Sequence, residues 1–265
     1  MPTVTPHAPG TFCWLDLAAH DAEAAKRFYT QLFGWEAADN RYGPDEGDVY
    51  TMYRLGGKDV AASYGMDPNQ RMMGVPSAWL CYVAVDDADA AAAQAKSLGA
   101  TVMADAFDVM DSGRMALVQD PAGALIALWQ PNTHLGMGLR DEAGTAGWFE
   151  LATNDTARAK AFYTALFGWT TSTMDTGVEY TVFHGPTGMA GGMYGMTEEM
   201  GEMPPCWLPY FVVNGTDAAL EKAKELGGGV LHGPMDIAGV GRTALLQDVQ
   251  GAMFYVITPA APQES

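Results

Sequence analysis

The chain has 265 residues, of which 48% are hydrophobic, 32 are acidic and 14 are basic, so its formal net charge is −18. This length exceeds one typical domain and supports sizeable hydrophobic cores. Phosphate backbones and anionic membranes repel so acidic a surface, which argues against nucleic-acid or membrane-surface partners. The first residues show no basic region followed by an apolar run, and three cysteines at unrelated spacings suit a reducing compartment, so we expect a cytoplasmic protein without disulfides.

The first quarter predicts a strand, a helix and three further strands. An apolar run at 11–18 is typical of a strand, and Asp21 stands where a helix N-cap belongs. Apolar residues recur at helical spacing as far as Phe33. Gly34 follows and is expected to end the helix. Strands are expected near Trp35, at 49–55 and at 60–66.

The second quarter repeats this plan. We expect a strand at 79–85, a helix at about 87–98 closed by Gly99, a strand near 101–102, and two strands around a turn at 121–123. Adding 65 to Trp14, Asp21 and Gly34 gives Trp79, Asp86 and Gly99. Residues 132–146 lack periodicity and form a linker.

The second half is a copy of the first. Residues 14–35 return as 148–169 with 13 of 22 positions identical, and later landmarks such as Gln119-Asp120 return as Gln247-Asp248. A repeat at fixed spacing determines the architecture and shows which positions are equivalent. We therefore expect four modules of about a quarter of the chain each.

A strand–helix–three-strand module whose helix ends in FYTxLFGW, with a D-P-x-G turn before its last strand, resembles the vicinal oxygen chelate superfamily of glyoxalases, bleomycin resistance proteins and extradiol dioxygenases. The resemblance implies an α+β fold of four βαβββ modules in two tandem glyoxalase-like domains, each with a curved mixed sheet around a cleft. The expected domains are 1–131, with modules at about 10–70 and 75–131, and 147–265, with modules at about 147–200 and 204–259. The tandem arrangement is similar to that of two-domain actinobacterial glyoxalase-like proteins.

The resemblance also implies four metal-ligand positions, two of them on the first strands of a domain's modules. Aligned through Asp21, Asp86, Asp155 and the FGW motif, these first-strand positions hold tryptophan throughout, and the last-strand glutamate positions hold Ala127 and Tyr255. An indole nitrogen is only a donor and cannot bind a metal as imidazole does. The five histidines show no ligand spacing. We therefore expect neither metal nor cofactor. The four tryptophans are Trp14, Trp79, Trp148 and Trp207.

Alternation along the strands predicts an aromatic lining with one carboxylate per domain, Asp16 and Glu150. Indole faces provide contact area for a flat ligand, and a carboxylate orients it. The expected ligand-binding residues are Trp14, Trp79, Trp129, Trp148, Trp207, Phe211, Tyr255 and Met193. Glu150 and Asp16 are the candidate catalytic residues.

Three interpretations stay open. The protein binds a small, aromatic organic molecule without catalysis, or it is a metal-free enzyme in which Glu150 or Asp16 acts as general acid or base. Alternatively, the tryptophans only fill space, with Arg114 and Arg242 neutralising the carboxylates. Binding is preferred, and detoxification of methylglyoxal has only the family resemblance behind it. The two domains pair within a monomer, or the chain forms a homodimer.

Overall fold

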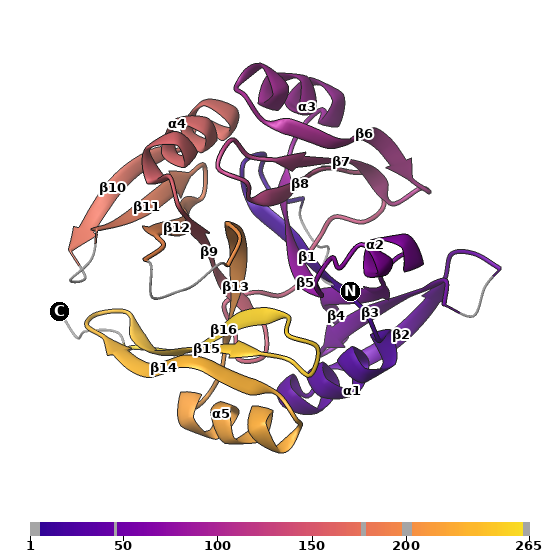
Figure 1. Ribbon diagram of the computed structural model, residues 1–265, viewed down its shortest axis with the longest axis vertical. Helices are drawn as coiled ribbons and strands as arrows, with labels where there is room; N and C mark the ends of the chain where they lie inside the picture. The colour runs from indigo at the N-terminus through magenta and orange to yellow at the C-terminus, as the bar shows by residue number, and fades with distance from the viewer. Residues whose placement is uncertain (1–5, 45–46, 176–178, 198–202, 262–265) are drawn as a thin grey trace. The chain divides into compact units, whose positions relative to one another are not determined.

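A computed structural model describes residues 6–44, 47–175, 179–197 and 203–261. The expected end of the third module, near residue 200, lies outside these residues. The α+β fold class is confirmed: within the described ranges, sixteen strands form two eight-stranded sheets, one from each half of the chain (Figure 1). Their strand orders are β2-β3-β4-β1-β5-β8-β7-β6 and β10-β11-β12-β9-β13-β16-β15-β14.

The first half contains the two expected modules. Its helices and strands are β1 (Phe12–Ala19), α1 (Ala22–Phe33), β2 (Glu36–Arg41), β3 (Val49–Leu55), β4 (Lys58–Gly65), α2 (Pro68–Met72), β5 (Ala78–Ala84), α3 (Ala88–Ser97), β6 (Thr101–Val109), β7 (Gly113–Gln119) and β8 (Leu125–Pro131). The short helix α2, between the two modules, was not expected.

The second half repeats these modules without a counterpart of α2 among the described residues. Its helices and strands are β9 (Ala146–Thr153), α4 (Thr156–Phe167), β10 (Thr170–Asp175), β11 (Glu179–Gly185), β12 (Gly188–Gly195), β13 (Cys206–Val212), α5 (Thr216–Glu225), β14 (Gly229–Ile237), β15 (Gly241–Gln247) and β16 (Met253–Pro259).

Local chemistry explains the boundaries of α1 and α4. The Asp21 and Asp155 side chains accept hydrogen bonds from the third backbone N–H of their helices, at Ala24 and Arg158. Gly34 and Gly168 follow the last helical residues with φ of 72° and 68°, a left-handed conformation that favours glycine. Both ends of the repeated motif are therefore set by its own residues.

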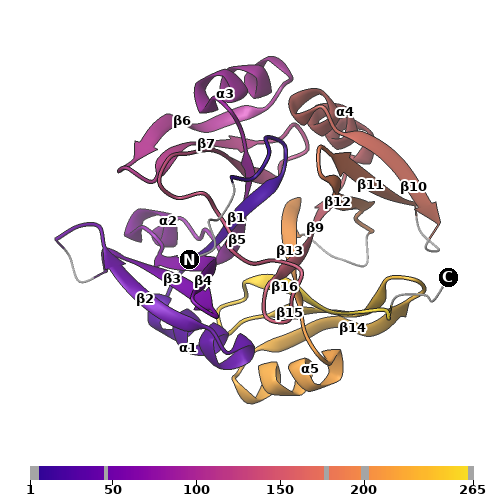
Figure 2. The same cartoon turned by 180° about the vertical axis from the view of Figure 1, so that it is seen from behind.

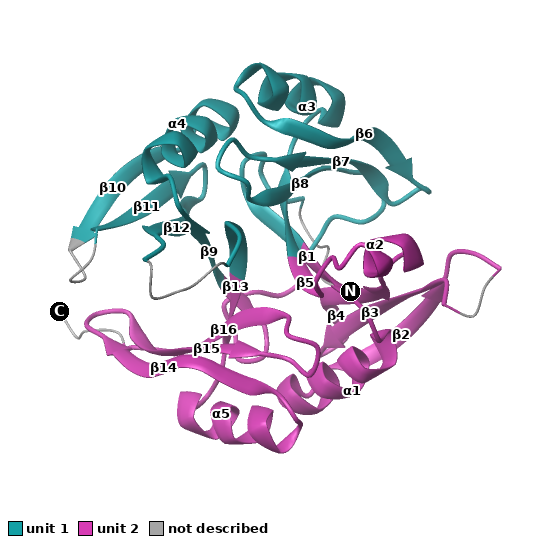
Figure 3. Ribbon diagram, in the orientation of Figure 1, with its two compact units in different colours: residues 1–14, 80–136, 148–208 teal, residues 15–79, 137–147, 209–265 magenta. Residues whose placement is uncertain are grey.

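Two compact units divide the chain differently from its halves (Figure 3). Unit 1 consists of residues 1–14, 80–136 and 148–208, and unit 2 of residues 15–79, 137–147 and 209–265. In unit 1, helices α3 and α4 lie side by side, and in unit 2 helix α1 lies beside α5 (Figure 2). Each unit thus joins modules from both halves, and the domain boundaries at 131 and 147 stay a prediction.

Buried aromatic side chains form the core of each unit. Phe12 stacks on Phe149 in unit 1 with ring centroids 4.3 Å apart, and in unit 2 Phe33 contacts Phe211 at 4.7 Å. Aromatic pairs at such separations add to the free energy gained by burying their area. No helix of the described residues is long and apolar enough to cross a membrane.

Candidate functional site

Each sheet has a helix face and a carboxylate face in this fold. The helix face packs on the helices, as when Phe183 of β11 contacts Tyr163 of α4. Side chains alternate along a strand, so Tyr180 and Glu150 project to the opposite face, which we call the carboxylate face.

Glu150 lies at the centre of a hydrogen-bonded cluster in unit 1. The residue is 5% exposed, and its Oε1 accepts a hydrogen bond of 2.6 Å from the Tyr180 hydroxyl. That hydroxyl accepts a 3.0 Å bond from Nε1 of Trp148. Burial and the nearby charge of Glu150 raise the pKa of Tyr180 far above its ordinary value, so the phenol stays protonated and donates. Trp148 and Tyr180 are only half-buried.

Gly192 makes room for this cluster. It pairs with Glu150 on β9 and with Val182 on β11. A Cβ atom at this position would collide with the Tyr180 hydroxyl. The missing side chain therefore lets the phenol reach Glu150 across the strand between them.

Asp16 has the corresponding place in unit 2. The residue is 2% exposed, and its Oδ2 accepts a 2.9 Å hydrogen bond from the hydroxyl of Tyr50, the repeat equivalent of Tyr180. The Tyr50 ring stacks on Tyr64 with centroids 6.1 Å apart. Burial, followed by the charge of Asp16, raises the pKa of Tyr64 far above its ordinary value. Two repeat-related carboxylates thus each accept from a tyrosine.

These tyrosines were not among the predicted site residues, although the sequence contains a signal for them. The dipeptide Tyr-Thr occurs at 50–51 and returns at 180–181 in the equivalent strand. A repeated tyrosine on the parity of a repeated acid predicts contact between them.

Arg114 and Arg242 do not neutralise the two carboxylates. Arg114 forms ion pairs with Asp89 and Asp108 at 2.7 and 2.8 Å, and Arg242 forms pairs of 2.9 and 2.8 Å with Asp217 and Asp236. These repeat-related ion pairs link α3 to β7 and α5 to β15. The alternative in which both arginines form structural salt bridges with Asp16 and Glu150 is therefore wrong.

Trp79 and Trp207 project to the helix face, so their expected place beside Trp14 and Trp148 is wrong. Trp79 donates a 3.0 Å hydrogen bond to the Tyr29 hydroxyl, which donates to Asp248 at 3.2 Å. Trp207 donates at 2.8 Å to Tyr163. The Tyr163 hydroxyl in turn donates to Asp120 at 2.8 Å. Each indole is therefore part of a buried trio of tryptophan, tyrosine and aspartate in the core of its unit.

A one-residue error in the alignment explains this misplacement. The N-cap of α3 is Asp87, whose side chain accepts from Ala90 N–H, and not the neighbouring Asp86. Counting back by the seven residues that separate Trp14 from Asp21 gives Leu80 in place of Trp79. The same count from Gly215, the N-cap of α5, gives Leu208. A shift of one residue moves every side chain of a strand to the other face.

The same error affects Phe211, which shares the parity of Trp207 and packs on Phe33 and Phe254 in unit 2. Met193 also lies on the helix face, because it pairs with Leu151 and Thr181. Their expected places with the carboxylates are therefore wrong. Of the eight candidate binding residues, the structure places Trp14, Trp129, Trp148 and Tyr255 on the carboxylate face.

The carboxylate face also carries aromatic pairs from the second and fourth modules. Tyr82 pairs with Ala127 and has its ring 6.2 Å from Trp129 in unit 1. In unit 2, Tyr210 stacks on Tyr255 with centroids 4.1 Å apart and an interplanar angle of 10°. Tyr82 and Tyr210 are thus the residues that β5 and β13 contribute to these aromatic pairs.

The linker covers the tryptophan of the first half. The His134 ring meets Trp14 edge to face at 4.4 Å, and the His134 carbonyl accepts a 3.1 Å hydrogen bond from Trp129. Trp14 is only 3% exposed as a result. Trp148, its repeat equivalent, is half-buried and bonded to Tyr180. The two halves therefore present their equivalent tryptophans differently.

The donor set does not fit a divalent metal of the kind that the fold resemblance implies. With the corrected alignment, the first-strand positions hold Trp14, Leu80, Trp148 and Leu208, none of which has a ligand atom. Across the described residues, no three His, Cys, Asp or Glu side chains come together as a metal site.

Comparisons with known proteins agree on the family. The model of the Glyoxalase/Bleomycin resistance protein/Dioxygenase superfamily matches residues 11–128, and a bleomycin resistance protein-like N-terminal model matches residues 146–186. The chain is 43% identical over 265 residues to the Mycobacterium tuberculosis protein CFP32, provisionally named a glyoxylase, covering 99% of this chain and all of the relative. It is 37% identical to the anthracycline biosynthesis protein DnrV of Streptomyces peucetius, covering 96% of this chain and 95% of the relative.

Solved structures agree on the fold. The Mn(II)-bound glyoxalase from Novosphingobium aromaticivorans superposes with a TM-score of 0.64 at 16% identity, covering 94% of this chain and 82% of the other. The 2,3-dioxygenase LapB from Pseudomonas sp. KL28 superposes with a TM-score of 0.63 at 13% identity, covering 99% of this chain and 97% of the other. The repeated modules, the two sheets and the full-length relatives together show that this chain belongs to the glyoxalase/bleomycin resistance/dioxygenase superfamily.

Proposed function

We propose that this protein binds a small organic molecule with a flat aromatic part, without a metal ion, against Trp148, Tyr180 and Glu150. The observation that carries this proposal is the chain of hydrogen bonds from the half-buried Trp148 through Tyr180 to the buried Glu150. It fixes an indole and a phenol on the same face as a buried carboxylate. An indole supplies contact area, and a carboxylate selects a donor group or a positive charge on the ligand.

The second half is the better candidate for the working site. Trp14 is buried beneath His134, whereas Trp148 keeps part of its surface exposed. A ligand can stack on Trp148 without displacing the linker. Asp16 and Tyr50 then belong to the equivalent site of the first half, in which the tryptophan is covered.

The name of one relative supports the ligand class. The protein at 37% identity is named for anthracycline biosynthesis, and anthracyclines are flat, fused-ring aromatic molecules. A ligand of this shape would bury one large face against an indole. Free thiols at Cys13, Cys81 and Cys206 suit a reducing compartment, so the proposal includes a cytoplasmic location and leaves a monomer or a homodimer as the assembly.

Tryptophan fluorescence tests the proposal with matched variants from the two halves. Flat aromatic compounds should quench the emission saturably, and Trp148→Ala should weaken binding by about 1–3 kcal/mol, the scale of burying one large side chain. Glu150→Gln and Tyr180→Phe should weaken binding, whereas Asp16→Asn and Tyr50→Phe should not. Equal effects of the two sets of variants would remove the preference for the second half, and no saturable quenching by any such compound would overturn the proposal.

A second candidate is a metal-free enzyme in which Glu150 transfers a proton to or from the bound molecule. The hydrogen bond from Tyr180 favours it, because a carboxylate held at 2.6 Å by a protonated phenol has a fixed orientation toward a substrate. In that case Glu150→Gln should lower turnover by about 10² to 10⁴ while affinity changes little. If the protein only binds, neither the wild type nor the variant should form product.

A further inference from the structure

His184 on β11 and Ser172 on β10 form a hydrogen-bonded pair beside the cluster around Glu150. Nε2 of the imidazole lies 2.7 Å from the serine hydroxyl. His184 is half-buried and Ser172 is exposed, so solvent reaches the pair. The pair lies entirely within unit 1, as do Trp148 and Tyr180.

Strand register places this pair on the carboxylate face. Ser172 lies opposite Val182 on β11, and Gly192 lies between Val182 and Glu150. Side chains of opposite residues project to the same face of a sheet, so Ser172 and Glu150 share one face. His184 follows Val182 by two residues and therefore has the same orientation. The pair thus belongs to the surface that carries Glu150.

The imidazole lies within reach of a flat molecule that stacks on Trp148. Because β11 runs antiparallel to β12 and β9, His184 is displaced from the row of Glu150 toward the end of β9 that carries Trp148. The two steps between neighbouring strands, from β9 to β12 and from β12 to β11, amount to about 10 Å. A system of three fused six-membered rings is about that long, so it can cover the indole and meet the imidazole.

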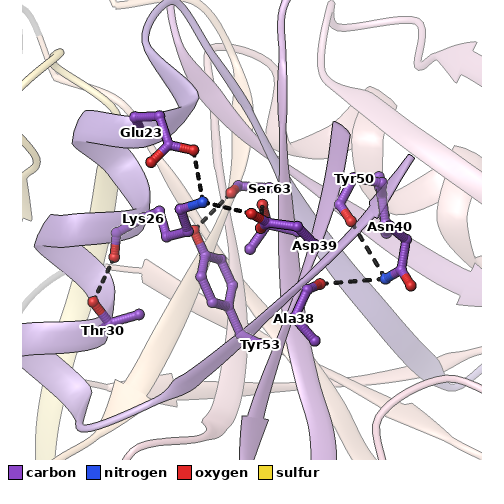
Figure 4. A network of polar contacts seen from close by, with 10 residues as sticks. Glu23, Lys26, Thr30, Ala38, Asp39, Asn40, Tyr50, Tyr53 and Ser63 are labelled. Atoms are coloured by element: carbon purple, nitrogen blue, oxygen red, sulfur yellow. Dashed lines mark hydrogen bonds and ion pairs between the residues drawn. The ribbon is translucent and has the colours of Figure 1, made fainter. Parts of the chain in front are cut away.

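The first half has other residues at these two places. Arg54 is the equivalent of His184, and Ala38, which is labelled in Figure 4, is the equivalent of Ser172. Arg54 forms an ion pair of 2.7 Å with Asp59, and the alanine carries no hydroxyl. In the half whose tryptophan is covered by the linker, an ion pair thus occupies this place. The histidine–serine pair accompanies the tryptophan that keeps part of its surface exposed.

The hydrogen bond to Ser172 occupies only one nitrogen of the His184 ring. In a neutral imidazole, Nδ1 donates if Nε2 accepts from the serine hydroxyl, and Nδ1 accepts if Nε2 donates. A hydroxyl group both donates and accepts, so it can bond to Nδ1 in either tautomer. A carbonyl oxygen only accepts and can bond in one tautomer alone. A hydroxyl group therefore matches the pair best.

We infer that the flat ligand is a fused-ring phenol whose hydroxyl group binds to Nδ1 of His184, with Ser172 as a positioning residue. The inference rests on the proposed function, because it requires the ring system to lie on Trp148. A donor group at the other end of the ligand bonds to Glu150, which accepts hydrogen bonds. The site thus selects a ligand by the separation between its two polar ends as well as by its flat shape.

Two anthraquinones that differ by one hydroxyl group test this contact in the full chain. The probe 2,6-dihydroxyanthraquinone has a hydroxyl group at each end, whereas 2-hydroxyanthraquinone has one, which the carboxylate binds as the stronger acceptor. His184→Phe keeps a flat ring and removes both nitrogens. It should weaken binding of the dihydroxy probe by about 5-fold or more, the factor for one hydrogen bond, and leave the monohydroxy probe unchanged. Tryptophan quenching gives the affinities, below the pKa of the probes' hydroxyl groups.

Ser172 provides variants that leave the imidazole in place. Ser172→Ala should weaken binding of the dihydroxy probe alone, whereas Ser172→Thr, which keeps the hydroxyl, should bind it as the wild type does. Equal losses in both variants would exclude the positioning role. Because Ser172 is exposed, these variants keep the test independent of any effect of His184→Phe on folding. Arg54→Gln, the matched change in the first half, should leave both affinities unchanged.

The variant Trp148→Ala separates this inference from the proposed function. Equal losses for the two probes in His184→Phe, or no loss for either, would overturn the inference, and weaker binding of both probes by Trp148→Ala would still support the proposed function. If neither probe binds, the inference fails, and other flat compounds that bind through Trp148 would keep the proposed function. Unchanged affinities in Trp148→Ala would overturn both.

Discussion

Tyr29 of α1 donates a hydrogen bond of 3.2 Å to Asp248, which is 219 residues away in the other half of the chain. The repeat-related pair, Tyr163 and Asp120, makes the same contact at 2.8 Å in unit 1. Each aspartate also accepts from backbone N–H groups of its own turn, as Asp120 does from Ala122 and Ala124. The tyrosine of the helix motif and the aspartate of the turn motif therefore join modules from the two halves.

Removing one of these hydroxyl groups should destabilise the fold. Tyr163→Phe leaves Trp207 Nε1–H and Asp120 Oδ2 buried without this partner, and Tyr29→Phe does the same to Trp79 and Asp248. We expect each change to lower the free energy of unfolding by about 1–3 kcal/mol, measured by urea denaturation. Tyr42→Phe, at an exposed position, is the control. A loss no greater than that of the control would show that these bonds do not stabilise the fold.

Ionisation of Asp248 should lower the free energy of unfolding as pH rises. Burial raises the pKa of its carboxyl in the folded protein, so the folded state binds the proton more tightly than the unfolded state. Its contribution is fully present below the ordinary aspartate pKa of about 3.9 and is lost as pH rises through the higher folded pKa. The unfolding free energy of the wild type minus that of Asp248→Asn should decrease across this window and then stay level.

Asp217 provides a control of opposite sign for that measurement. Its hydrogen bond to Arg242 lowers its pKa, so its contribution is present above the ordinary aspartate pKa and is lost as pH falls through the lowered value. The difference between wild type and Asp217→Asn should therefore increase with pH. If both variants gave the same sign of slope, the assignment of the Asp248 effect to burial would be wrong.

Gly192→Ala should disrupt the cluster around Glu150. The new methyl group would occupy the place of the Tyr180 hydroxyl, so the phenol must move away from the carboxylate. We expect a loss of unfolding free energy of about 1–3 kcal/mol, the usual cost of overpacking, together with weaker binding of aromatic probes. Gly195→Ala on the same strand, where the nearest atom would be 3.5 Å away, should do neither. Unchanged probe affinity in Gly192→Ala would separate ligand binding from this cluster.

Chelation should have no effect on binding by this protein. Trp14, Leu80, Trp148 and Leu208 supply no ligand atoms, so the affinity for aromatic probes should be the same before and after treatment with EDTA. Elemental analysis of protein purified without chelator should find well under one transition metal ion per chain. Stoichiometric zinc, nickel, manganese or iron whose removal abolishes binding would contradict the metal-independent proposal.

Local patterns were enough to predict the four modules, because strand alternation, the Asp21 and Asp155 caps and the closing glycines act over a few residues. They also placed Trp148 and Glu150 on one face, since both lie on one strand two residues apart. They could not decide between Asp86 and Asp87 as the cap of α3, because either aspartate suits an N-cap. The wrong choice put Trp79 and Trp207 on the wrong face.

Contacts between distant groups depend on how the modules pack. Asp248 reaches Tyr29 and Asp120 reaches Tyr163 because modules from different halves pack together, which no local pattern encodes. The partners of the two carboxylates are tyrosines on neighbouring strands because strand register brings Tyr180 and Glu150 to the same face, with Gly192 between them. Arg114 and Arg242 form ion pairs with exposed aspartates, since an exposed ion pair avoids the desolvation that burial of a guanidinium requires.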